Sequence, residues 1–339
     1  MRDTVLKLFE SITRIFSGEP MLLAEQDTGY SLAEAIDRVI EGTDTKLRLV
    51  PGYRKKLQQE VAASLEYITQ LVDQISGPMD ISRKTFVSDP EVRAYFSTPD
   101  ALQNIFSCGT ELKAFFDQSE NASLDVCCAL LCADKEEKKI MGSVLEGEFI
   151  RRDVMQTAIS FFDYKVLSPA IDGREVRSGI KKCIFDGLVT YALQNIANIK
   201  IERRDLVHRR RILHAQLRSR QTGRNGLSAM LAEAHFKSEQ CKNLAEELKE
   251  AESQLKNITG DKDVLSFYLE EIRKVLAQPE NFIQLNRACF HLSDMGIKLD
   301  GDAAQSDNAV CFSELEITNV MKRVVTIIRY NRNEINCRN

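Results

Sequence analysis

The sequence predicts a mainly α protein with a helical body, a projecting antiparallel coiled-coil hairpin and a small C-terminal antiparallel β element. Two observations carry this prediction for the body and the hairpin. Trp is absent, and Gly and Pro number only 16 and 7 among 339 residues, which favours helices over a large sheet. Apolar residues also recur at three- and four-residue spacing over long stretches, as helices require. A third observation gives the β element, because runs of β-branched and aromatic residues gather near the C-terminus.

The hairpin is predicted from two long segments, residues 190–221 and 227–258. The loop between them contains Gly223, Asn225 and Gly226, and these residue types suit a helix C-cap and a reversal of the chain. Each arm has 32 residues and would be roughly 48 Å long. Because the loop interrupts the apolar repeat, we expect the arms to pair within one chain. The alternative is one long helix that dimerises with another chain.

A seam of residues at three- and four-residue spacing runs along each arm. In the first arm it comprises Ala192, Ile196, Ile199, Arg203, Leu206, Arg210, Leu213, Leu217 and Arg220. In the second arm it comprises Leu227, Leu231, Ala234, Ser238, Cys241, Ala245, Leu248, Glu252 and Leu255. Folding the arms about the loop predicts that paired residue numbers sum to about 448. In that register Leu217 contacts Leu231, and Ile199 contacts Leu248.

The chain divides into four predicted regions. Standard helix starts, such as the capping box at Ser31 and the prolines at positions 51, 90 and 99, indicate an N-terminal α-helical domain over residues 1–120. A central helical block covers residues 121–189, and the hairpin covers 190–258. Residues 259–339 combine helices with the small β element. Within the first region, residues 3–16 form an amphipathic stretch that we expect to pack on the core, because its polar face is not strongly cationic.

Local patterns refine the two regions that flank the hairpin. Residues 121–168 are expected to be helical, and a single helix is expected from Asp172 to Gln221. After the hairpin, helices are expected at about 262–277 and 281–295. The two runs 309–317 and 320–330 are the expected strands, which would form a sheet of two or three strands.

Two clusters could carry metal chemistry. Cys128 and Cys132 are four residues apart and would share one face of a helix. Structural zinc sites usually add histidine or paired two-residue spacings, so we interpret these cysteines as small buried apolar residues. Glu146, Glu148 and Asp153 could hold a divalent ion or serve as acid–base groups. The simpler interpretation is a helix crossing at nearby glycines, with the acids paired to neighbouring arginines. We therefore predict no metal site, no cofactor and no catalytic residue.

The charge distribution is uneven. The net charge is −4, but residues 200–224 hold nine basic and two acidic residues. That segment therefore has a net charge of +7, and the rest of the chain carries −11. The candidate anion- or partner-binding residues are Arg203, Arg204, Arg209, Arg210, Arg211, Arg218, Arg220 and Arg224. They could bind phosphates of nucleic acid, or they could pair with the acidic second arm and with acidic protein surfaces.

Cysteine usage and hydropathy suggest a compartment. The nine cysteines show no regular spacing, and no signal peptide or membrane span is visible, so we expect reduced thiols and a cytoplasmic protein. No nucleotide-binding or hydrolase motif is present. We therefore predict a non-enzymatic interaction or scaffolding protein with a protein partner or self-association. The alternatives are a nucleic-acid-associated protein and a metal-dependent enzyme built on the acidic cluster.

Overall fold

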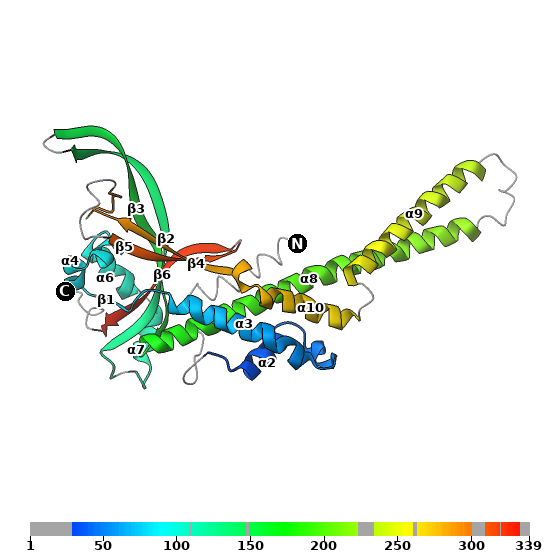
Figure 1. The fold of residues 1–339 in the computed structure, drawn as a ribbon, viewed down its shortest axis with the longest axis horizontal. Coiled ribbons are helices and arrows are strands. Elements are labelled where there is room, and N and C mark those ends of the chain that lie inside the picture. Colours follow the sequence, from blue (N-terminus) through cyan, green and yellow to red (C-terminus); the bar gives the residue numbers. More distant parts are fainter. Residues whose placement is uncertain are drawn as a thin grey trace. The chain divides into compact units, whose positions relative to one another are not determined.

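The fold contains a large sheet as well as helices, so the predicted mainly α class is wrong. A computed structural model describes residues 29–108, 110–121, 123–146, 149–222, 234–259, 263–293, 295–299, 309–318 and 320–332. Helices make up 57% of the structure and strands 29%. A six-stranded sheet takes the place of the predicted small β element (Figure 1). The predicted helix over residues 3–16 lies outside the described residues.

The described residues form two compact units. The first unit takes in residues 29–31, 62–187 and 278–332, and the second takes in Leu32–Val61 and Leu188–Ala277. Two helices, α3 (Tyr53–Asp73) and α8 (Gly173–Thr222), contribute residues to both units. None of the described helices is long and apolar enough to cross a membrane.

The sheet of the first unit has the order β3-β2-β6-β5-β4, and β1 pairs in parallel with β6. All other pairs are antiparallel. The strands are β1 (Met79–Ile81), β2 (Val126–Glu146), β3 (Phe149–Ala170), β4 (Ile283–His291), β5 (Ala309–Ile317) and β6 (Met321–Asn331). Four short helices in this unit are α4 (Arg83–Ser88), α5 (Pro90–Tyr95), α6 (Pro99–Cys108) and α7 (Thr110–Asp117).

Residues 121–168, which were predicted to be helical, instead contain the strand pair β2 and β3, whereas the end of the predicted central block, residues 173–189, is helical in α8. Both faces of β2 are buried at its start, where Cys127, Ala129 and Leu131 belong to the core that includes side chains of α5, α6 and α7. On the opposite face, Cys128 and Cys132 are also at most 4% exposed. A strand buried on both faces shows a continuous apolar run instead of alternation, and periodicity cannot separate such a run from a buried helix.

The C-terminal region is partly as predicted. The strands expected at 309–317 and 320–330 are confirmed by β5 and β6. The helix expected at 281–295 is wrong, because residues Ile283–His291 form β4 next to β5. The expected helix at 262–277 is confirmed as α10 (Val264–Ala277), and the long helix from residue 172 is confirmed as α8.

Cysteine chemistry also differs from the prediction. Cys289 of β4 and Cys311 of β5 are directly opposite in register and are joined by a disulfide, so the expectation of nine reduced thiols is wrong for this pair. The thiols of Cys127 and Cys132 are free and buried, and burial raises the pKa of each to about 12. Such thiols are protonated at neutral pH and are poor metal ligands or nucleophiles.

The segment after α3 is fixed by backbone contacts. The guanidinium of Arg177 donates to the carbonyl oxygens of Val72, in the last turn of α3, and of Ile75, just after α3, at 2.6 and 2.9 Å. The amide of Ile327 in β6 donates to the carbonyl of Ser76 at 2.9 Å. This close approach leaves no room for a side chain at Gly77, where an added Cβ would lie 2.1 Å from the carbonyl oxygen of Ile327.

We predict that Gly77→Ala lowers the free energy of unfolding by roughly 3 kcal/mol or more, because it combines a positive φ of 109° with a backbone clash. Gly52→Ala is the matched control. Gly52 also has a positive φ, of 68°, but an added Cβ would meet nothing within 4 Å, so about 1 kcal/mol is expected. Urea unfolding measures both variants, and equal effects would contradict the prediction.

Candidate interaction surface on the helical hairpin

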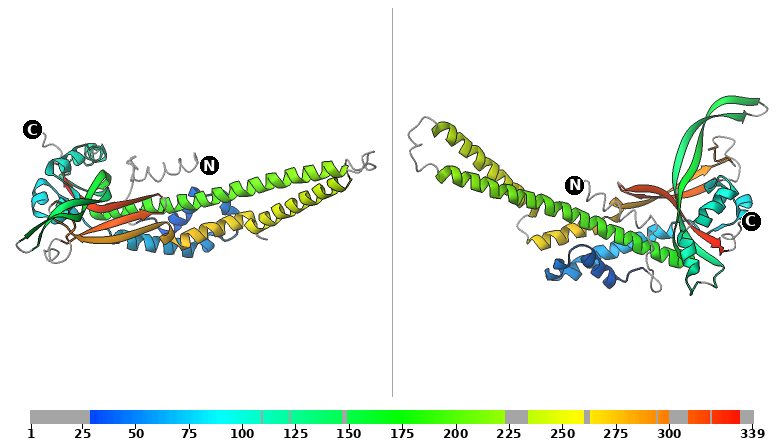
Figure 2. Two further views of the ribbon diagram at one scale, coloured as in Figure 1. Left: turned by 90° about the horizontal axis from the view of Figure 1, so that it is seen from above. Right: turned by 180° about the vertical axis from the view of Figure 1, so that it is seen from behind.

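The two predicted arms lie side by side within one chain. Helix α8 has 50 residues and α9 (Ala234–Thr259) has 26, and they run antiparallel in the second unit (Figures 1 and 2). Ion pairs join them between Arg209 and Glu247 at 3.7 Å and between His214 and Glu252 at 3.6 Å. These contacts support the intrachain hairpin over a single long helix. The predicted loop residues 223–226 lie outside the described residues.

Burial confirms the seam of the first arm. Ala192, Ile196 and Leu213 are at most 5% exposed. The half-buried seam residues of this arm are Ile199, Arg203, Leu206, Arg210 and Leu217. In the second arm the pattern differs from the prediction. Ala251 is 1% exposed, whereas Ala245 and Glu252, which were expected in the seam, are exposed. The half-buried apolar residues of this arm are Cys241, Leu244, Leu248, Leu255 and Ile258.

The predicted register is wrong. The residue numbers in the two ion pairs sum to 456 and 466, whereas the prediction placed contacts at sums near 448. The described part of α9 begins at Ala234, and Leu231 lies outside the described residues. Periodicity identifies the face of a helix that packs, but it does not fix the axial position of one helix against another.

At the base of the hairpin, Lys200 of α8 is held by two groups. Its ammonium lies 2.6 Å from a carboxylate oxygen of Asp44 and 5.2 Å from the ring centroid of Tyr268 in α10. Asp44 also accepts from the amide of Lys46 as the N-cap of the short helix η1 (Thr45–Leu49). Burial alone raises the pKa of Asp44, but the bonds from Lys200 and Lys46 outweigh it, and the pKa lies below its ordinary value.

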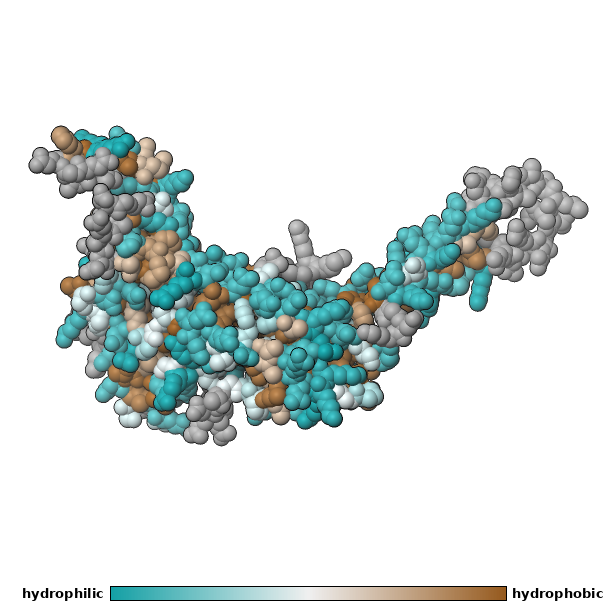
Figure 3. All heavy atoms as spheres, viewed as in Figure 1, coloured by the Kyte–Doolittle hydropathy of each residue, from teal (hydrophilic) through white to brown (hydrophobic). Residues whose placement is uncertain are grey.

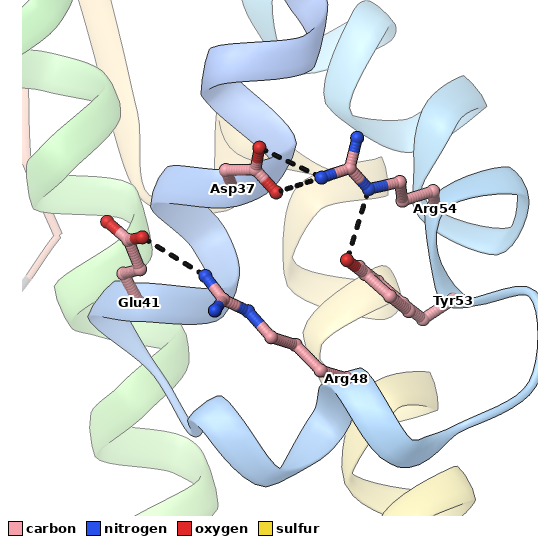
Figure 4. A network of polar contacts seen from close by, with 5 residues as sticks. All are labelled: Asp37, Glu41, Arg48, Tyr53 and Arg54. Carbon is pink, nitrogen blue, oxygen red and sulfur yellow. Dashed lines mark hydrogen bonds and ion pairs between the residues drawn. The ribbon is translucent and has the colours of Figure 1, made fainter.

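Further ion pairs connect the remaining helices of this unit. Arg273 of α10 donates to Glu60 of α3, with Nε 3.0 Å from Oε1. Figure 4 shows a network between α2 (Leu32–Gly42) and the segment that follows it. There Arg54 holds both carboxylate oxygens of Asp37, at 2.8 and 3.1 Å, and Arg48 reaches Glu41 at 3.1 Å. Ion pairs as exposed as these contribute little to stability.

The eight candidate arginines occupy different environments. Arg203 and Arg210 are half-buried along the seam, and Arg209 pairs with Glu247 of the other arm. The side chain of Arg220 and the whole of Arg224 lie outside the described residues. The exposed members on α8 are Arg204, Arg209, Arg211 and Arg218.

Three of these arginines form one stripe away from α9. Arg204, Arg211 and Arg218 are spaced by seven residues, which places them on one side of the helix about 10.5 Å apart. That side is opposite the buried seam. Ile201 and Ile212 lie along the same side and are 45% and 44% exposed. We call these five residues the outer face of α8. It combines guanidinium groups with exposed apolar side chains.

Of the three acids in the predicted cluster, the structure describes the side chain of Asp153. Asp153 is an exposed residue of β3 with a φ of 58°. Glu146 ends β2, but its side chain and all of Glu148 lie outside what the structure describes. Within the described part of the chain, no group of three or more possible ligand residues could hold a metal ion. The hypothesis of an acidic metal site therefore stays a prediction.

No protein-family model, curated protein or solved structure matches this chain.

We predict that Leu213→Ala loosens the hairpin, because Leu213 is buried in its seam. A loss of about 2 kcal/mol in the free energy of opening is expected, at the lower end for a buried leucine. Hydrogen exchange of the amides in α8 and α9 measures this opening. Ile212→Ala, next in sequence but exposed, is the control and should leave exchange unchanged. Equal protection in both variants would contradict the observed seam.

The pKa of Asp44 also predicts a pH dependence. Because the folded pKa lies below 3.8, Asp44 contributes stability above about pH 4, and this contribution is lost as the pH falls through the folded pKa. We expect Asp44→Asn to reduce stability at neutral pH and to flatten the decline in stability below pH 4. Asp205→Asn, at an exposed position of α8, is the control. If the stability of Asp44→Asn declined below pH 4 as steeply as that of the wild type, the prediction for Asp44 would be contradicted.

Proposed function

We propose that this protein is a non-enzymatic interaction or scaffolding protein, and that its helical hairpin binds a protein partner through the outer face of α8. The observation that carries the proposal is the composition of this face. Arg204, Arg211 and Arg218 lie beside the exposed Ile201 and Ile212 on the side of α8 that α9 leaves uncovered. Arginine is enriched in protein interfaces, where its planar group pairs with carboxylates over an apolar surround.

The chemistry of the face also indicates the kind of partner. Three positive charges about 10.5 Å apart favour an acidic surface that extends along the helix axis. The two isoleucines add a binding term that does not weaken with salt, because apolar burial is not screened. We therefore propose an acidic partner with apolar residues between its carboxylates, such as the charged side of another helix.

Nucleic acid is a second candidate partner. The stripe of three arginines could contact backbone phosphates by charge alone. No aromatic residue lies in the basic segment 200–224, so stacking on bases would not contribute. Such binding would fall steeply with added salt, whereas a mixed apolar and charged protein interface would be retained in part.

The test compares two triple variants of the full chain that lose the same charge. The first is Arg204→Ala, Arg211→Ala and Arg218→Ala on the outer face of α8. The matched control is Lys242→Ala, Lys249→Ala and Lys256→Ala, three exposed lysines of α9 that are also spaced by seven residues. Proteins captured by the wild type are identified and purified, and their affinity for each variant is measured at low and physiological salt.

We expect the arginine variant to bind a captured partner at least roughly tenfold more weakly than the lysine variant, with circular dichroism unchanged. Equal affinities would contradict the proposed face. Labelled duplex and single-stranded nucleic acid are measured in parallel. Nucleic acid would be favoured as the partner if two results are found together. The protein binds nucleic acid at low salt but loses this binding at higher salt and in the arginine variant, and no protein partner stays bound at physiological salt.

A further inference from the structure

The sheet of the first unit is closed on itself by a short segment, residues 296–299. Strands β3 and β4 stand at the two ends of the strand order. Ile297 pairs antiparallel with Ala158 of β3, and Lys298 pairs antiparallel with Leu292, which directly follows β4. The segment therefore lies between the two outermost strands and connects them, so we call residues 296–299 the closing segment.

Few contacts hold the closing segment. The Lys298 ammonium lies 2.8 Å from a carboxylate oxygen of Glu137 and 4.0 Å from the ring centroid of Phe290. The described backbone hydrogen bonds of the segment, at 2.8 to 2.9 Å, run from the amides of Ile159, Ser293, Lys298 and Leu299 to the carbonyls of Gly296, Ile297, Thr157 and His291 respectively. By contrast, β4 and β5 pair over nine residues. A short ladder opens at a lower free energy than a long one, so the closing segment can detach while the rest of the sheet stays formed.

The disulfide between Cys289 of β4 and Cys311 of β5 lies beside this closure. Cys289 is two residues before His291, whose carbonyl accepts the amide of Leu299. Backbone groups of alternate residues point to the same edge of a strand, so those of Cys289 and His291 both point away from β5. Cys289 and Cys311 are therefore a pair without backbone hydrogen bonds between them, and the disulfide is the link that joins the two strands at this position.

The disulfide lies on the face of the sheet opposite the core. Phe290, Val310 and Phe312 pack in the core, and successive side chains of a strand alternate between the two faces. Cys289 is exposed and Cys311 is half-buried. Among the cysteines whose side chains the structure describes, Cys289 alone is exposed. A disulfide in such a position is accessible to a thiolate, and exposed disulfides are the more readily reduced ones.

We propose that the Cys289–Cys311 disulfide is a thiol-sensitive switch that controls the closure of the sheet. In the oxidised form, the disulfide holds the end of β4 on β5 and so fixes the strand edge with which the closing segment pairs. Reduction by a low-molecular-weight thiol, such as glutathione, frees the end of β4 and lets the closing segment detach from β3. This proposal is independent of the partner of the hairpin.

The exchange balances in two steps. A thiolate of the small thiol attacks Sγ of Cys289, the S–S bond breaks, and its electron pair leaves with Sγ of Cys311, which takes up a proton. A second small thiolate attacks the small thiol's sulfur in the mixed disulfide, which releases Cys289 as a thiolate that is also protonated. Two small thiols, which supply the two protons and two electrons, are thereby oxidised to one disulfide, and the protein disulfide is reduced to two thiols.

The pKa values of other thiols keep this exchange selective. Burial raises the pKa of Cys127 and Cys132 to about 12 and that of Cys183 to about 11. These thiols are therefore protonated at neutral pH, and the thiolate is the form that attacks a disulfide. Reduction and reoxidation of the Cys289–Cys311 pair can then proceed without exchange with these three cysteines.

The far end of the β4–β5 pair is held independently of the disulfide. Ile283 of β4 and its partner Ile317 are 1% and 3% exposed, and the hydroxyl of Tyr67 in α3 donates to the carbonyl of Ile283 at 2.8 Å. The disulfide instead restricts the chain between two cysteines 22 residues apart, which contains the closing segment. Breaking it returns conformational freedom to the opened state, so reduction favours opening at the closing segment.

Opening would uncover apolar side chains that the closed sheet covers. Leu292 is 5% exposed, and Phe290 is half-buried against the core. Among the described residues on the face drawn in Figure 3, hydrophilic ones predominate. Newly exposed apolar surface would therefore be detected with a dye that binds to such surface.

The test equilibrates the full-length protein with glutathione at several ratios of the reduced to the oxidised form. Alkylation followed by mass spectrometry measures the fraction of Cys289 and Cys311 that is reduced, and hydrogen exchange measures opening. We expect the disulfide to become reduced over this range of ratios, and the amides of Ile159 and Lys298 to exchange at least roughly tenfold faster in the reduced protein. Dye binding should rise with the reduced fraction, whereas amides of the β2–β6 ladder should stay equally protected.

The double variant C289S/C311S should exchange rapidly at the closing segment in every buffer. Cys241→Ser, at a half-buried cysteine of α9 in the second unit, is the matched control and should keep the response of the wild type. Circular dichroism verifies that each variant is folded. A double variant that is folded but exchanges as slowly as the oxidised wild type would overturn the proposal.

The wild type alone also decides the outcome, so the result does not depend on whether the double variant folds. The proposal is overturned if the pair stays oxidised in reduced glutathione alone, or if it stays reduced in oxidised glutathione alone. It is also overturned if the amides of Ile159 and Lys298 are equally protected in both forms. Loss of protection by the same factor throughout the sheet would show global unfolding in place of a switch, and would overturn it as well.

Discussion

The pairing of β2 along both of its edges is the constraint on which the first unit depends. From Cys128 to Ala133, β2 lies between β3 and β6, and the side chains on both of its faces are buried there. This segment can be strongly apolar because neighbouring strands lie along both of its edges and packed side chains cover both of its faces. The short helices that contribute to one face of the core, including α6 and α7, could not bury their aromatic residues without it.

The same strand changes character where its second neighbour ends. After Ala133 the side chains become charged, and Arg323 connects β6 to both β2 and β3. Farther along the two strands Met141, Phe149, Ile150 and Met155 are exposed. One strand therefore serves first as the centre of a core and then as a surface.

In the second unit, charge and apolar packing are divided between opposite sides of one helix. The buried side of α8 holds Leu213 in the seam, whereas Lys200, at the base of the hairpin and on the same side of the helix as Arg218, is held by Asp44. The outer face holds arginines and isoleucines that are exposed. This exposed face is the surface on which we place recognition.

The sequence by itself determined the elements whose signal is local. Helix α8, the short helices that begin at Pro90 and Pro99, and the strands β5 and β6 follow from caps, prolines, apolar spacing and β-branched runs. It also located the cationic segment on the hairpin. Only the tertiary structure decided that residues 126–170 form strands, because their pairing partner β6 lies about 200 residues later in the chain. The tertiary structure also decided the register of the hairpin, because helical periodicity carries no information on the axial position of one helix against another. It likewise decided that Cys289 lies opposite Cys311.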